Sequence, residues 1–76
     1  GLILEMTPSM ASPSNVRMAI GAVPRDLFDQ VIIRGTPEEL GALVGAISDE
    51  FRGTPYRVMF DGPTVRVAPI NPQGPL

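Results

Sequence analysis

Arginine is the residue type best able to do chemistry in this chain, because it supplies all of the positive charge. The 76 residues include six Arg, no Lys and no His, against eight acidic residues. The planar guanidinium group donates paired hydrogen bonds to carboxylate and phosphate groups. Side-chain alternation along the predicted strands places four arginines and one methionine on the same face of a sheet. We therefore expect a partner-binding sheet face made of Arg17, Arg34, Arg57, Arg66 and Met59.

The clearest evidence for this face is a predicted hairpin that turns at Asp61-Gly62. A two-residue Asp-Gly loop favours a tight turn and fixes the register of its strands. The resulting register pairs Phe60 with Pro63 and places Arg57 opposite Arg66. Like charges directly opposite each other destabilise a strand pair, so the two arginines require an explanation such as a bound anion.

Two other interpretations of the same arginines remain open. An exposed face of an antiparallel sheet is ordinarily polar, so the arginines are also explained by solvation alone. Nucleic acid is the alternative partner, although a net charge of −2 and a pI near 4.8 do not favour non-specific DNA binding. The predicted register also turns Tyr56 and Phe60 to the opposite face, where they do not stack on bases.

Few groups in the chain are suited to catalysis. Cys, His and Lys are absent, which excludes a thiolate nucleophile, an imidazole base and a Schiff-base lysine. Glu38-Glu39 is explained as the acidic first turn of a helix. Asp26 and Asp29 provide too few oxygen ligands for a calcium site. We therefore expect a protein that is not an enzyme, with no catalytic residue, no cofactor and no metal.

The most strongly predicted element is a helix that begins after Thr36. The segment Thr36-Pro37-Glu38-Glu39 provides an N-cap hydroxyl, a proline at the first helical position and a glutamate at the capping-box position. Gly53 occupies the position of a C-terminal cap. The spacing of the apolar residues between them predicts one buried stripe. That stripe consists of Leu40, Leu43, Val44, Ile47 and Phe51.

Four strands are predicted around this helix from alternation, β-branched residues and turn signals. They cover residues 16–23, 30–34, 56–60 and 63–68. The predicted fold class is α+β in the order ββαββ, in which one helix packs on one face of a four-stranded sheet. The order of the strands within the sheet stays open, because the second and third strands are either parallel neighbours or separated.

The predicted domain covers residues 16–69, between an N-terminal arm or linker over 1–15 and a Pro-rich tail over 70–76. Arg66 to Pro72 matches the basic-x-x-Pro-x-x-Pro pattern that SH3-type grooves accept. Because Arg66 is needed in the last strand, a plain extended tail is the preferred interpretation.

The longest apolar run is Leu2-Ile3-Leu4. It is far shorter than the roughly 20 residues of a membrane span, and no basic residue precedes it as in a signal peptide. We therefore expect a cytoplasmic protein that does not associate with a membrane.

Two features predict self-association as a homodimer or higher oligomer. Leu2, Ile3 and Leu4 are suited to pairing with a sheet edge, in the same molecule or in a neighbour. Gly41 and Gly45 interrupt the predicted helix at a cost of about 1 kcal/mol each relative to Ala, which favours close packing of another segment. Drift at solvent-facing positions is the alternative explanation for the glycines.

The function we expect is a small non-catalytic protein-interaction module, such as an assembly, adaptor or regulatory subunit. It recognises an acidic protein surface through the arginine face, or its own copy. A nucleic-acid-binding or regulatory protein that uses the same face is the alternative. An accessory subunit that completes another protein's active site with an arginine is a third class left open.

Overall fold

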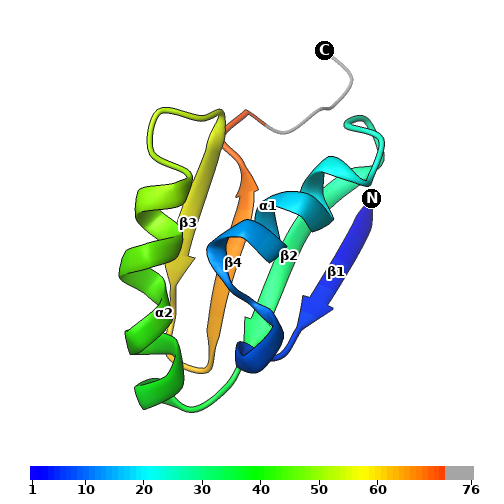
Figure 1. The fold of residues 1–76 in the computed structure, drawn as a ribbon. Helices are drawn as coiled ribbons and strands as arrows, with labels where there is room; N and C mark the ends of the chain where they lie inside the picture. The colour runs from blue at the N-terminus through cyan, green and yellow to red at the C-terminus, as the bar shows by residue number, and fades with distance from the viewer. Residues whose placement is uncertain (72–76) are drawn as a thin grey trace.

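The computed structural model describes residues 1–71 and contains a mixed four-stranded sheet with two α-helices on one face (Figure 1). The strands lie in the order β1-β2-β4-β3; β1 and β2 are parallel, and β4 is antiparallel to both of its neighbours. The α+β class and the four-stranded sheet are confirmed, whereas the single helix and the ββαββ order are wrong. The elements are β1 (Leu2–Met6), a 3-10 turn η1 (Pro8–Met10), α1 (Pro13–Gly21), β2 (Phe28–Arg34), α2 (Pro37–Glu50), β3 (Tyr56–Phe60) and β4 (Thr64–Pro69).

The strand predicted over residues 16–23 is instead helix α1. The Ser12 side chain accepts a hydrogen bond from the Asn15 backbone N at 3.2 Å, and Pro13 occupies the first turn. Val16 and Ile20 are four residues apart and form the buried side of the helix. Met18, which alternation places on the same face as these two, is 68% exposed.

The N-terminal segment 1–15, expected to form an arm or linker, contributes β1, η1 and the first turn of α1 to the domain. Strand β1 pairs with the edge of β2, with Leu4 beside Val31 and Met6 beside Ile33. The edge pairing expected for the apolar run therefore occurs within one chain. Because parallel strands require a crossover connection, α1 occupies the link between β1 and β2.

Helix α2 matches its prediction at the N-terminus and along its apolar stripe, but it ends at Glu50 with Phe51 as the C-cap, two residues before Gly53. The Thr36 hydroxyl accepts a hydrogen bond from the Glu39 backbone N at 3.2 Å, and the Glu39 carboxylate accepts one from the Thr36 backbone N at 2.9 Å. This reciprocal pair is the capping box. Leu40 and Ile47 are fully buried against the sheet, so the apolar stripe faces the core.

Replacing Thr36 with alanine should lower the free energy of unfolding by about 1 kcal/mol, because the Glu39 N–H loses its acceptor. In a domain of this size the melting temperature should fall by about 4–8 °C. Thermal unfolding followed by circular dichroism measures the change. Thr36→Ser keeps the hydroxyl and serves as the control; equal losses in both variants would contradict the role of the cap.

The hairpin of β3 and β4 is confirmed, but its predicted turn is wrong. Phe60 pairs with Val65 rather than with Pro63, and the backbone N of Asp61 donates to Thr64 O at 3.1 Å. Gly62 has a φ of 79°, so the chain reverses at Gly62 and the proline that follows it. A proline at the turn has no N–H to leave unpaired. The register moves by two residues, which keeps every side chain on its predicted face.

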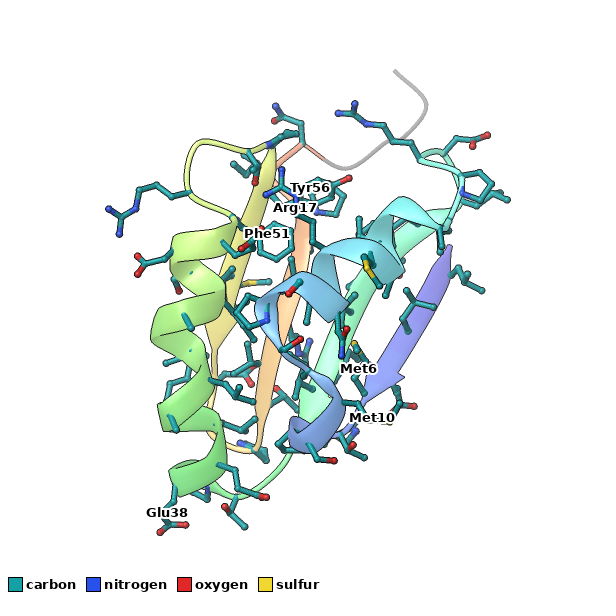
Figure 2. The ribbon with its side chains drawn as sticks, viewed as in Figure 1. Met6, Met10, Arg17, Glu38, Phe51 and Tyr56 are labelled. Carbon is teal, nitrogen blue, oxygen red and sulfur yellow. The ribbon has the colours of Figure 1, made fainter. Side chains whose placement is uncertain are left out.

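The core lies between the sheet and the two helices. Its fully buried side chains come from β2, β4, both helices and Ala11, which lies just before α1. Phe51 and Tyr56 lie together at one end (Figure 2), where the Tyr56 ring makes edge-to-face contacts with Phe51 and Phe28. The largest fully buried side chains are Ile33, Leu40, Ile47, Val16, Val31, Val65 and Val67.

Within residues 1–71, no helix has the length and hydropathy needed to cross a membrane.

Candidate interaction face

The face of the sheet opposite the helices carries the candidate site. Val31, Val58 and Val67 lie in one row that points to the core, so the neighbouring residues along each strand point the other way. We call this surface the open sheet face. It comprises Ile3, Glu5, Gln30, Ile32, Arg34, Arg57, Met59, Thr64, Arg66 and Ala68.

One row of the open sheet face crosses all four strands. Glu5, Ile32, Arg66 and Met59 are successive register partners along it. Ile32 is only 7% exposed although no helix packs over it. The aliphatic stems of its long neighbours are suited to cover it, since Arg and Glu keep only their heads in water. The face therefore has an apolar centre with charged groups around it.

The guanidinium groups on this face differ in how far nearby carboxylates balance them. Arg34 Nε lies 3.1 Å from Glu5 Oε1, which is a close ion pair. Arg66 Nε lies 3.8 Å from Asp61 Oδ2 and 3.5 Å from the Thr64 hydroxyl, so it is held loosely. These two ion pairs leave less positive charge on the face than the arginines alone suggest.

On the open sheet face, Arg57 is the guanidinium group that has no carboxylate partner among residues 1–71. Its Nη2 atom lies 3.2 Å from the Met59 sulfur, and within the described part of the chain it makes no ion pair. Arg57 is opposite Ala68, and Arg66 is opposite Met59. The two arginines are therefore diagonal neighbours rather than directly opposed, and the predicted like-charge pair does not occur.

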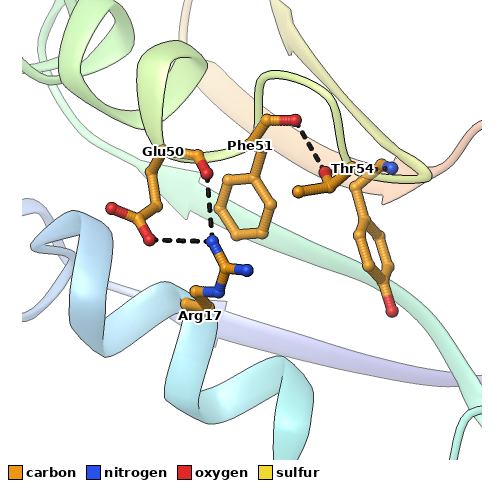
Figure 3. A network of polar contacts seen from close by, with 5 residues as sticks. Arg17, Glu50, Phe51 and Thr54 are labelled. Atoms are coloured by element: carbon orange, nitrogen blue, oxygen red, sulfur yellow. Dashed lines mark hydrogen bonds and ion pairs between the residues drawn. The ribbon is translucent and has the colours of Figure 1, made fainter.

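The structure brings four of the five predicted partner-binding residues together and excludes the fifth. Arg34, Arg57, Arg66 and Met59 lie on the open sheet face. Arg17 lies on α1, on the helix-covered side, because its segment forms a helix and not a strand. Its guanidinium donates to a Glu50 carboxylate oxygen at 3.0 Å and to the Glu50 backbone O at 3.2 Å, so it links α1 to the end of α2 (Figure 3).

The residues predicted for self-association lie on two separate elements. Leu2, Ile3 and Leu4 belong to β1, whereas Gly41 and Gly45 are on the exposed side of α2, where an added Cβ atom would contact nothing within 4 Å. Close packing against another part of residues 1–71 therefore does not explain these two glycines. The proline pattern that starts at Arg66 begins inside β4, and Pro72 lies outside the described residues.

Three residues on or beside the face are not among those predicted from the sequence: Ile32 at its centre, and the carboxylates of Glu5 and Asp61. The three consecutive apolar residues at 31–33 were the available signal, since a strand that is apolar on both faces has a covered surface on each side. Within residues 1–71, no group of three or more acidic side chains is placed to hold a metal ion.

The fold and the face define a small α+β domain with a one-sided mixed sheet. No protein-family model, curated protein or solved structure matches the chain.

Proposed function

We propose that this chain is a small non-catalytic interaction module that binds an acidic segment of a partner protein on the open sheet face. The observation that supports this most is the one-sided packing of the sheet. Both helices cover one face, and the opposite face presents three guanidinium groups around the apolar side chain of Ile32. Interfaces combine an apolar centre with a polar rim, and they are enriched in Arg and Met.

Arg57 and Arg66 determine the geometry of the acidic segment. Diagonal neighbours on antiparallel strands are about 7–8 Å apart. Alternate side chains of an extended peptide are about 7 Å apart, because a strand rises about 3.3 Å per residue. An extended segment with carboxylates at alternate positions therefore places one carboxylate on Arg57, which has no ion pair among residues 1–71, and the next on the loosely held Arg66.

A peptide fits this face better than a nucleic acid does. Base stacking needs aromatic rings on the binding surface, and the open sheet face has none among the described residues: Tyr56 and Phe60 are on strand positions of the opposite face, where Phe60 is 46% exposed. Glu5 and Asp61 also reduce the positive field that a phosphate backbone requires.

The test is a titration with a fluorescent Glu-Thr repeat peptide, followed by anisotropy and by amide chemical shifts. We expect shifts on β2, β3 and β4, and a loss of affinity of about tenfold or more in Arg57→Glu, because hydrogen bonds between charged groups are the strong ones. Arg52→Glu is the matched control. It makes the same change of charge beyond the end of α2, where Arg52 pairs with Asp49, and it should leave the affinity nearly unchanged.

Three results would contradict the proposal. The first is no binding of the peptide by the unmodified chain. The second is an equal loss in both variants, which would indicate a general effect of net charge. The third is tighter binding of a single-stranded oligonucleotide of equal charge with a steep salt dependence, which would favour the nucleic-acid alternative.

A further inference from the structure

Strand β1 has one hydrogen-bonded side and one free side. In the sheet order β1-β2-β4-β3 it pairs only with β2. The backbone N of Leu2 donates to Leu27 O at 2.6 Å, so this residue turns its polar groups toward β2. In a parallel pair, successive residues of a strand direct their backbone N–H and C=O groups to alternate sides of the strand. Ile3 and Glu5 therefore direct theirs to the free edge.

This edge lacks the features that usually prevent edge-to-edge pairing. Native edges carry lysines, prolines or bulges, and the segment Leu2–Met6 contains neither Lys nor Pro. Its one charge, on Glu5, is paired with Arg34. The register irregularity near Leu2 is an extra residue in β2, Asp29, so β1 itself stays regular. At the other edge of the sheet, α2 packs beside β3 (Figure 1).

Each end of β1 adjoins an apolar hollow. At its start, Leu2 and Leu27 line one hollow with the three residues that follow α1, Ala22, Val23 and Pro24. At its end, Met6 and Met10 line a second hollow together with Glu5, Thr7 and Arg34, and Figure 2 shows the two methionines together at that end of the strand. Leu2 and Ile3 are 48% and 47% exposed, which is high for large apolar side chains in a strand.

We infer that the free edge of β1 pairs antiparallel with β1 of a second copy of this chain, centred on Leu4. In this register Ile3 of each copy faces Glu5 of the other. Ile3 and Glu5 are the residues whose backbone N–H and C=O groups point to the free edge, so each Ile3-Glu5 pair forms two N–H···O hydrogen bonds between the copies. Leu2 faces Met6 of the second copy, so the hollow at the start of one strand meets the hollow at the end of the other.

The side chains select this register over its neighbours. A pairing centred on Glu5 places two carboxylates directly opposite each other, which is unfavourable. A pairing centred on Ile3 leaves Met6 without a partner. In the register centred on Leu4 the two-fold axis is perpendicular to the sheet, so the helices of both copies lie on the same side. This interface adjoins the open sheet face at Glu5, which pairs with Arg34, but it lies two strands away from Arg66 and three from Arg57, which make the proposed peptide contacts.

The test is the oligomeric state of the full chain and of two variants at one position. Ile3→Glu places a carboxylate opposite Glu5 of the second copy and should weaken dimerisation about tenfold or more. Ile3→Lys removes the same apolar side chain but places an ammonium group there, so it should retain the dimer. Sedimentation equilibrium over a range of concentrations gives the dissociation constants, and circular dichroism checks that each variant is folded.

Ile70→Glu is the distant control, because Ile70 is 49% exposed and lies outside β1. It should leave the dimer intact. The inference is overturned if the unmodified chain is monomeric at all concentrations, or if Ile3→Glu and Ile3→Lys have equal effects. A dimer that persists in Ile3→Glu and dissociates in Gly45→Leu would place the interface on α2, which also overturns it. None of these results depends on the binding of an acidic peptide.

Discussion

Replacing Ile33 with alanine should lower the free energy of unfolding by about 2–5 kcal/mol. Ile33 is fully buried in β2, between β1 and β4, and it faces the helices. The shorter side chain loses transfer free energy and leaves a cavity that neighbours on three sides cannot fill. Stabilities of small domains are about 5–15 kcal/mol in total, so this change removes a large share. Urea unfolding followed by circular dichroism measures it.

Ile70→Ala is the matched control for this prediction. It deletes the same atoms from a side chain that is half exposed and lies after β4. Surface changes of this kind stay within about 0.5 kcal/mol. Comparable losses at the two positions would show that Ile33 does not lie in a packed core.

Replacing Gly35 with alanine should destabilise the domain by about 1–3 kcal/mol, because the site has no room for a methyl group. A Cβ atom at this position would lie 2.6 Å from Pro8 Cγ and 3.1 Å from Glu39 Oε1. The proline ring cannot turn aside, and the carboxylate belongs to the capping box of α2. Thermal unfolding of the variant measures the loss.

Gly41→Ala is expected to have the opposite sign. Gly41 is inside α2 and exposed, and an added Cβ atom would contact nothing within 4 Å. Alanine should therefore stabilise the helix by about 0.5–1 kcal/mol through its higher helix propensity. If the two glycine substitutions change stability in the same direction, the packing described around Gly35 is wrong.

The elements that could be predicted from sequence are those defined by local signals. Helix α2 carries its own cap and a long apolar period, and the β3-β4 hairpin carries a turn between alternating segments. The predicted turn is one residue too early. Two overlapping pairs, Asp61-Gly62 and Gly62-Pro63, are both suited to a two-residue turn. The turn forms at Gly62-Pro63 because Pro63 has no N–H to donate to a neighbouring strand.

The errors concern short segments and pairings between distant residues. Over eight residues, Val16 and Ile20 fit a strand and a helix equally well, because a spacing of four satisfies both periods. The cap at Ser12 and Pro13 was the signal for a helix. The parallel pairing of β1 with β2 joins residues that are distant in sequence, and no local sequence signal indicates it. The predicted sheet face therefore includes Arg17, which lies on α1, and lacks Glu5, which lies on β1.

The position of β4 between β2 and β3 determines when the sheet can form. Among the described strands β4 is the last to be synthesised, yet it joins β3 to the rest of the sheet. A nascent chain that ends before Thr64 has only the β1-β2 pair to build on, and its apolar residues on β3 have no strand beside them. The domain should therefore fold in one cooperative step after its last strand has left the ribosome.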